Sequence, residues 1–182
     1  MPQPRDTPAP WRDILASHLQ QTPGYEFSLG TVEYDSQGRA VPRVRTCGHR
    51  GFFPELQLHP SGQEDMKQQV ENGGNPHIYE SDMLTFTTDI RMEKLPQIDA
   101  AGHAVEGVFW LKDLMTQWRV KGRAFAFGNP AGEDDIEELV SREKVKEWLR
   151  AKQHVDGDIK EWTWEKAVTE YFANHSPMMR GM

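Results

Sequence analysis

Three polar clusters in the chain carry residue types that hold a phosphate group or a heterocycle. They are Arg43-Val-Arg-Thr-Cys-Gly-His-Arg50, Thr87-Thr-Asp-Ile-Arg-Met-Glu-Lys94 and Thr116-Gln-Trp-Arg-Val-Lys-Gly-Arg123. Guanidinium, ammonium and hydroxyl groups donate hydrogen bonds to a phosphate monoester, and a glutamine offers both a donor and an acceptor to the amide edge of a heterocycle. Taken alone, each cluster also fits a solvated strand face or a capped helix start.

Arg45 and Arg50 of the first cluster reach one anion only if their strand bends between them. Alternation with a period of two puts these residues on opposite faces of a regular strand. Gly48 lies between them, and a bend or bulge is expected there. Without that bend, the arginines form a charged edge that discourages pairing with another sheet.

The second cluster follows an apolar, strand-prone run from Met83 to Asp89. Beyond it, a short helical segment from Arg91, limited by Pro96, places Arg91 and Lys94 on one side at spacing i, i+3. With the threonine hydroxyls and the free N–H groups of a helix start, this arrangement predicts a binding site for a phosphate group. The alternative is a helix capped by Asp89 and followed by surface charges.

Strands dominate the elements that the hydrophobic pattern predicts. Alternation predicts strands at residues 25–34, 40–53, 83–89, 105–111 and 117–127. Helical spacing predicts helices at residues 11–22, 129–153 and 161–174. The polar stretch 54–82 reads as an insertion between two strands, with at most one helical turn near 64–70. Short turns between strands predict a mainly β fold with flanking helices, arranged as an antiparallel barrel.

The composition excludes several classes of protein. The 182 residues carry a net charge of -7, which argues against a nucleic-acid or anionic-membrane surface. No run approaches the roughly 20 apolar residues that span a bilayer, and the N-terminus has no apolar signal core. The single cysteine, Cys47, excludes an internal disulfide framework and fits a reducing compartment. A soluble, cytoplasmic protein is therefore expected.

Other chemistries find little support in the sequence. The seven histidines show no H-x-x-x-H or Cys/His pairing, so no metal site is expected. The glycines form neither a P-loop nor a G-x-G-x-x-G motif. Cys47 has cationic neighbours that lower a thiol pKa, but a cysteine in a strand is more often a small packed residue.

The order and spacing of the three clusters resemble the pyridoxamine 5′-phosphate oxidase-like family of FMN-binding split barrels. The family patterns R-x-V-L-L-K, Y-T-N-x-x-S-R-K and R-Q-V-R-I-x-G correspond to "RTCGHR", "TTDIRMEK" and "TQWRVKG". A branch of the family with A-P-W-R and F-T-T-D-x-R-x-x-K motifs is similar to Ala9 to Leu15 and Phe86 to Lys94. The resemblance covers residues from about Pro10 to Gly128.

The resemblance implies a split β-barrel homodimer with FMN at the subunit interface. The residues that it assigns to the phosphate and the flavin are Arg45, Arg50, Thr87, Thr88, Arg91, Lys94 and Gln117. Of these, Gln117 contacts the flavin ring system, from the second subunit if the site is shared. The chain then divides into a lead-in (1–9), an FMN-binding split-barrel domain (10–128, with the insertion 54–82) and a C-terminal helical segment that packs on the barrel (129–182).

This chain departs from the oxidase pattern at the phosphate site and at its C-terminal end. Glu93 stands where the oxidase has a phosphate-binding arginine, for which Arg91 substitutes, and Arg50 replaces a lysine. The substrate-binding segment near the oxidase C-terminus has no counterpart. FMN binding therefore carries over from the family, whereas pyridoxamine 5′-phosphate as a substrate does not.

Three functions remain open from the sequence, and no catalytic acid or base can be named. The first is an FMN-dependent oxidoreductase that acts on a small molecule. The second is a protein that holds FMN without turnover, and the third is an interaction module that has lost the flavin.

Overall fold

The computed structural model describes residues 6–22, 24, 26–56, 74–128, 136–153 and 159–173. The chain forms two compact units that alternate along the sequence. The sheet unit comprises residues 8–49 and 86–144, and the C-terminal unit comprises residues 1–7, 50–85 and 145–182. The division into domains at residues 9 and 128 stays a prediction.

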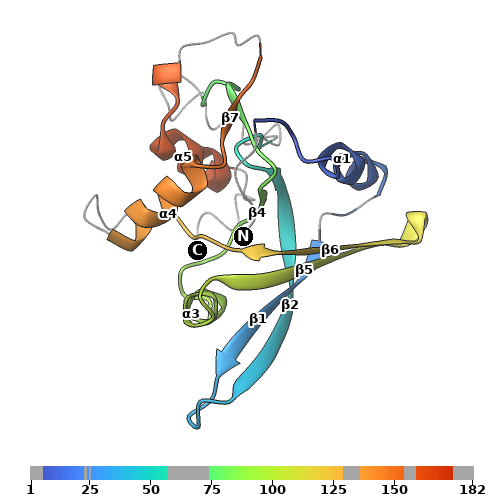
Figure 1. The fold of residues 1–182 in the computed structure, drawn as a ribbon, viewed down its shortest axis with the longest axis vertical. Coiled ribbons are helices and arrows are strands. Elements are labelled where there is room, and N and C mark those ends of the chain that lie inside the picture. Colours follow the sequence, from blue (N-terminus) through green and yellow to red (C-terminus); the bar gives the residue numbers. More distant parts are fainter. Residues whose placement is uncertain are drawn as a thin grey trace. The chain divides into compact units, whose positions relative to one another are not determined.

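Five strands form the main sheet in the order β4-β2-β1-β5-β6 (Figure 1). Their bounds are Glu26–Tyr34 (β1), Ala40–Phe52 (β2), Leu84–Phe86 (β4), Ala104–Leu111 (β5) and Thr116–Arg123 (β6). β1 pairs antiparallel with both β2 and β5, and β5 pairs antiparallel with β6. A mainly β fold of antiparallel strands with flanking helices is therefore confirmed, and it is consistent with a split barrel.

The β1–β2 hairpin is held by its turn. The Asp35 carboxylate accepts hydrogen bonds from the backbone N–H groups of Gln37 and Arg39, at 2.8 and 2.9 Å. Gly38 takes a φ of 73°, which a glycine adopts without steric cost. The predicted turn between two strands is therefore confirmed. The hydrogen bonds and the glycine conformation that form it all lie within residues 35–39.

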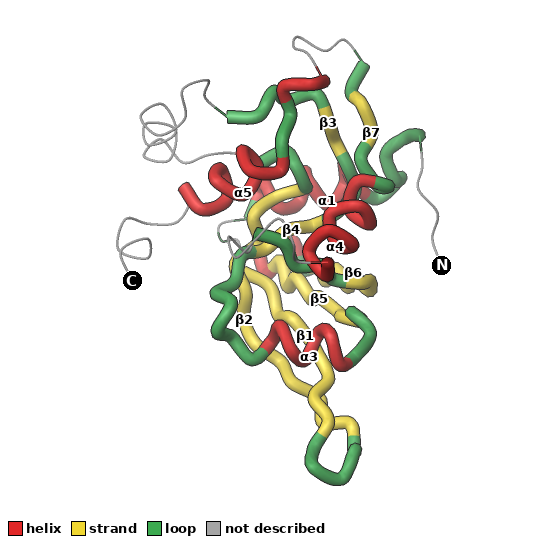
Figure 2. The backbone as a smooth tube through the Cα atoms, turned by 90° about the vertical axis from the view of Figure 1, so that its left-hand side faces the viewer, coloured by secondary structure: helices red, strands yellow, loops and turns green. Residues whose placement is uncertain are grey.

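The core face of the sheet is the side on which Phe27 and Leu29 of β1 and Phe109 and Leu111 of β5 lie. All four side chains are buried, and the rings of Phe27 and Phe109 stack at 5.0 Å. Each such burial contributes roughly 1.5–3 kcal/mol. Helix α3 (Lys94–Ala100) packs against β1 and contributes buried Ile98 (Figure 2).

The segment between β4 and α3 differs from the prediction. β4 ends at Phe86, so the two threonines and Asp89 lie outside the sheet. α3 begins at Lys94, and Pro96 lies in its first turn, where a missing N–H leaves no hydrogen bond unmade. The predicted helical turn from Arg91 that Pro96 limits is therefore wrong, because the helix begins three residues later and continues through Pro96.

The remaining helices are α1 (Arg12–Gln21), α4 (Ile136–Lys146) and α5 (Trp164–Ala173), with short 3-10 helices at Lys112–Leu114 and Ile159–Glu161. All three α-helices lie within predicted ones. In the sheet unit, buried Leu15 anchors α1, and the Trp118 indole of β6 donates to His18 of α1 at 3.1 Å. None of the helices in the described residues is both long and apolar enough to cross a membrane.

The C-terminal unit contains a two-stranded sheet that the sequence did not predict. β3 (Tyr79–Glu80), inside the expected insertion, pairs antiparallel with β7 (Arg150–Ala151). The Arg150 guanidinium forms a bidentate pair with the Asp82 carboxylate, with both N–O distances at 2.9 Å. The helical turn expected near residues 64–70 lies outside the described residues.

Candidate functional site

Arg45 of β2 lies on the core face of the sheet. Its register partner is Leu29, and residues directly opposite each other in an antiparallel pair point to the same side. The guanidinium donates to the Thr31 hydroxyl and to the Gln97 side-chain oxygen, each at 2.5 Å. Both partners are neutral, and among the described residues Arg45 forms no ion pair. The half-buried positive charge of Arg45 therefore has no carboxylate partner among the described residues.

Lys94 is the second half-buried cation. As the first residue of α3, it donates from its ammonium group to the Thr88 hydroxyl at 2.8 Å. The Thr88 hydroxyl donates in turn to the Asp89 carbonyl oxygen, at a long 3.3 Å. Lys94, too, has no ion-pair partner within the described part of the chain. Thr87, next to this pair, is half-buried.

Cys47 lies on the same face of the sheet as Arg45. It lies opposite Phe27 on the core face and is buried. Burial raises the pKa of its thiol, while the positive charges of Lys94 and Arg45 act on that pKa in the opposite direction. Both positive charges therefore lower the pKa of this thiol, that of Lys94 more than that of Arg45, but burial outweighs them. Cys47 is the small packed residue that the sequence favoured over a reactive thiol.

Arg91 is held by a different partner. Its guanidinium binds the Asp89 carboxylate through Nε at 2.9 Å and Nη2 at 2.6 Å, and the side chain is exposed. This pair and the Arg91 N–H hold the pKa of Asp89 well below its usual range. Arg91 thus carries its own counter-ion, and Lys94 does not share a helical turn with it. Glu93, the residue that departs from the family pattern, is exposed and precedes α3.

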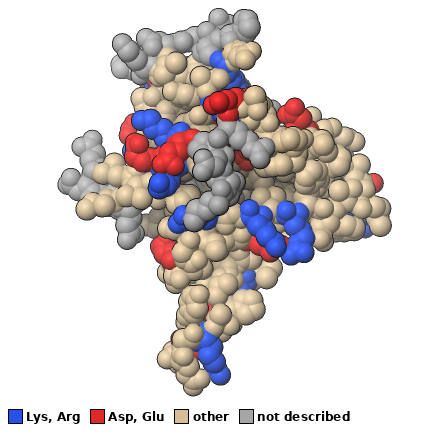
Figure 3. Space-filling model, in the orientation of Figure 1, with Lys and Arg blue, Asp and Glu red and all other residues tan. Residues whose placement is uncertain are grey.

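Gln117 of β6 lies on the face opposite Arg45. It pairs with exposed Trp110, while its neighbour Trp118 pairs with buried Phe109 of the core face. Gln117 is exposed and begins a polar row that continues with Arg119, Lys121 and Arg123. Figure 3 shows Lys and Arg side chains gathered over β5 and β6 beside acidic ones, in keeping with the Arg119–Glu106 ion pair at 2.5 Å.

The pairing of β1 with β2 shows no bulge up to Gly48. The β1–β2 register runs without an inserted residue from Ala40 to Gly48. His49 then contacts the core-face ring of Phe109 edge-on at 5.4 Å, so the alternation continues past the glycine. The bulge expected at Gly48 is therefore absent from this pairing, and the assignment of Arg45 and Arg50 to one phosphate stays a prediction. Arg50 is half-buried and belongs to the C-terminal unit, where the left-handed φ of 98° falls on Gly51.

Two buried polar residues beside Arg45 are not part of any of the three polar clusters in the sequence. Thr31 and Gln97 are only 4% and 5% exposed, and the Thr31 hydroxyl donates to the Gln97 side-chain oxygen at 2.7 Å. Together they orient the guanidinium of Arg45. Thr31 continues the apolar phase of Phe27 and Leu29, so its place in the alternation was the signal that it faces inward.

The donors on the core face fit a phosphate monoester. Arg45 and Lys94 provide positive charge that no described carboxylate neutralises, and the Thr88 hydroxyl adds a donor beside Lys94. Burial of the cations strengthens their attraction for an anion relative to that of exposed side chains. No group of His, Cys, Asp and Glu that is suited to a metal ion occurs among the described residues.

Comparison with protein families agrees with this geometry. Residues 8–128 match the family model described as "Pyridoxamine 5'-phosphate oxidase, FMN-binding domain". All seven residues that the sequence assigned to the flavin lie in this range. Comparisons with curated proteins and with solved structures find no match.

Proposed function

We propose, since the chain belongs to the pyridoxamine 5′-phosphate oxidase FMN-binding family, that it is an FMN-dependent oxidoreductase acting on a small molecule. The family match makes the chain an FMN-binding flavoprotein, and the redox activity is the proposal. The observation that supports FMN binding is the pair of half-buried cations, Arg45 and Lys94, whose described partners are neutral oxygens.

We assign the phosphate of FMN to Arg45, Lys94 and Thr88, at the core face of the sheet. Lys94 offers a point charge, and the Arg45 guanidinium offers planar donors that Thr31 and Gln97 keep in one orientation. Thr88 donates its hydroxyl, because its present acceptor at 3.3 Å is a weak one. Bound FMN supplies hydride transfer, so the protein has to orient it, neutralise its phosphate and admit a substrate.

A homodimer is part of this proposal, and the position of Gln117 supports it. Arg45 and Gln117 project from opposite faces of the sheet, so the Gln117 of the same chain is poorly placed for a flavin whose phosphate lies at Arg45. The Gln117 of a second chain removes this conflict, and its exposed amide suits the polar edge of the isoalloxazine ring. A cytoplasmic location is part of this proposal, because Cys47 is a free thiol.

The absorption spectrum of the purified protein tests the proposal in two steps. Flavin bands that survive dialysis, or that appear after FMN is added, are expected. Anaerobic reduction by NADH or NADPH should then bleach these bands, and air with candidate acceptors should restore them. A colourless protein that takes up no FMN contradicts the whole proposal. Bound flavin that neither nucleotide nor any candidate substrate reduces contradicts the oxidoreductase activity alone.

A further inference from the structure

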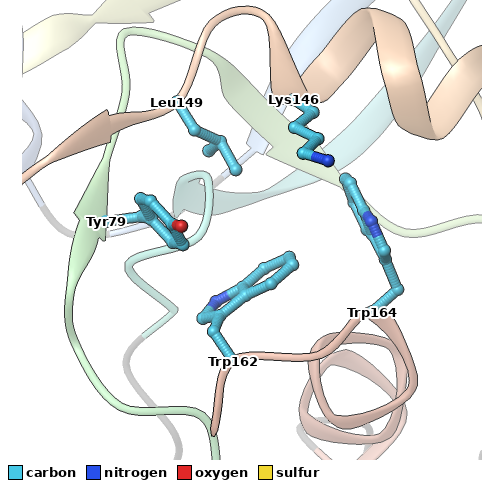
Figure 4. Close-up of a pocket in the computed structure, with 5 residues that line it drawn as sticks. All are labelled: Tyr79, Lys146, Leu149, Trp162 and Trp164. Atoms are coloured by element: carbon cyan, nitrogen blue, oxygen red, sulfur yellow. The ribbon is translucent and has the colours of Figure 1, made fainter. Parts of the chain in front are cut away.

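Buried hydrogen-bonding side chains surround Arg45 on the core face of the sheet. The C-terminal unit offers a different environment, because its pocket is lined by two tryptophans and a tyrosine (Figure 4). Beside Arg45 lie Thr31 of β1 and Gln97 of α3, which are only 4% and 5% exposed. Neither residue belongs to the seven that the family patterns assign to the flavin, yet both bind the guanidinium.

The three side chains close a ring of hydrogen bonds. Arg45 donates from Nη1 to the Thr31 hydroxyl and from Nη2 to the Gln97 side-chain oxygen, each at 2.5 Å. The Thr31 hydroxyl donates to the same oxygen at 2.7 Å. A guanidinium has five N–H groups and cannot accept, so Gln97 has to present its oxygen here. The other three N–H groups of Arg45 have no partner among the described residues.

Helix α3 carries both Gln97 and Lys94. The two residues are three positions apart and therefore lie on the same side of the helix. α3 packs against β1, the strand that contains Thr31, and Lys94 donates to the Thr88 hydroxyl. One helix thus supplies a cation to the proposed phosphate site and the neutral acceptor that orients the second cation.

The neutrality of Gln97 determines what Arg45 can bind. A carboxylate in its place would accept the same two hydrogen bonds, but it would also form an ion pair with the guanidinium and neutralise it. The amide oxygen fixes the plane of the guanidinium and leaves its positive charge for an anion. Arg91 shows the opposite arrangement, because its guanidinium binds the carboxylate of Asp89.

We propose that Gln97 is a specificity-determining residue of the phosphate site. Its neutral side chain orients Arg45 without neutralising it, and the site therefore prefers FMN to riboflavin, which lacks the phosphate. Gln97 acts through Arg45 and is thus a positioning residue. This inference rests on the proposed flavin function.

Fluorescence titration of the full chain with FMN and with riboflavin tests this role, because the ratio of the two dissociation constants reports on the phosphate. Gln97→Glu keeps the shape and both hydrogen bonds but adds a carboxylate beside Arg45. Gln97→Met keeps the length and the neutrality but removes the acceptor. Gln37→Glu is the control for the added charge, because Gln37 is exposed in the turn of the β1–β2 hairpin.

Gln97→Glu should reduce the preference for FMN over riboflavin by roughly 10- to 100-fold, the contribution of one hydrogen bond to a charged group. Gln97→Met should reduce it by about three- to tenfold, because Arg45 keeps its charge and has to be ordered on binding. Riboflavin affinity should stay unchanged in both variants, and Gln37→Glu should match the wild type. A residue that served only the fold would give the reverse order, since Gln97→Glu retains both hydrogen bonds.

An unchanged preference for FMN in Gln97→Glu, or a larger loss in Gln97→Met, would overturn the role of Gln97 and leave the flavin function intact. A loss of riboflavin affinity as large as that of FMN affinity would overturn it too, because the substitutions would then act on the fold and not on the phosphate. If Gln97→Glu does not fold, an unchanged preference in Gln97→Met overturns the role by itself. Wild-type protein that takes up no FMN would instead contradict the proposed flavin function, and this role with it.

Discussion

Replacement of Lys94 by methionine tests the phosphate site. Methionine keeps most of the length and the apolar stem of lysine but removes the ammonium group that donates to Thr88 at 2.8 Å. The side chain is half-buried, so its loss affects a partly desolvated charge rather than a fully solvated one. The variant should therefore keep its fold and lose affinity for the phosphate of FMN.

The size of this loss follows from the kind of contact removed. A hydrogen bond to a charged group contributes about 1.5–3 kcal/mol, and each 1.4 kcal/mol is a factor of ten in the dissociation constant. Lys94→Met should thus weaken FMN binding by roughly 10- to 100-fold. Arg91→Met is the control, because Arg91 is exposed and already paired with Asp89. We expect it to change FMN affinity by less than about threefold.

Quenching of FMN fluorescence on binding measures both dissociation constants, and riboflavin separates the phosphate from the ring. Riboflavin lacks the phosphate, so Lys94→Met should bind it as the wild type does. Unchanged FMN affinity in Lys94→Met would refute the phosphate assignment. Equal losses for FMN and riboflavin would refute it as well, because they would indicate a general disturbance of the site. A larger loss of FMN affinity in Arg91→Met than in Lys94→Met would indicate that Arg91, in the exposed turn before α3, binds the phosphate instead.

Further predictions concern the stability and reactivity of the chain. Asp82→Asn should destabilise the protein by about 3 kcal/mol in urea unfolding, because it leaves the 9% exposed guanidinium of Arg150 without its bidentate partner; a change below about 1 kcal/mol would contradict this. Burial raises the pKa of Glu170, so the folded protein binds the proton of this carboxyl more tightly than the unfolded chain does. The protonated carboxyl therefore stabilises the fold fully below about pH 4.3, and this stabilisation is lost as the pH rises through the raised pKa. Glu170→Gln should therefore gain stability relative to the wild type between pH 4.3 and pH 7, and parallel stability curves would disprove this. Native Cys47 should react with a thiol reagent far more slowly than in urea, because the side chain is buried and its pKa is raised; equal rates would show that the sulfur is accessible.

Elements with local causes could be predicted from the sequence. The β1–β2 hairpin depends on Asp35 and Gly38, which form a turn within residues 35–39. The alternation of exposed and half-buried residues in β6 follows the alternation of polar and apolar residues in its sequence. The three predicted helices follow apolar spacing that needs no knowledge of the partner surface. Lys94 and Thr88 were predicted as neighbours of one phosphate, and they do lie within hydrogen-bond distance of each other.

Features that depend on distant contacts could not be predicted. Arg45 takes its orientation from Gln97, which is 52 residues away, and a local pattern does not record such a contact. The strand β4 ends at Phe86 although Thr87 and Thr88 favour strands, because the end of a strand depends on its pairing with a neighbouring strand, which a local pattern does not record. Tyr79 lies in a stretch rich in Pro, Gly and Asn, and its partner in β7 is Ala151, 72 positions later in the chain.

A mixed dimer tests the shared flavin site most directly. Lys94→Met and Gln117→Ala chains, each with a different affinity tag, are coexpressed, and particles that carry both tags are titrated with FMN. Each variant alone should bind weakly. If the phosphate site of one chain works with Gln117 of the other, the mixed dimer has one native site and one doubly altered site. One tight FMN per mixed dimer is therefore predicted. No tight site in the mixed dimer, or tight FMN binding by a single wild-type chain, would contradict the account.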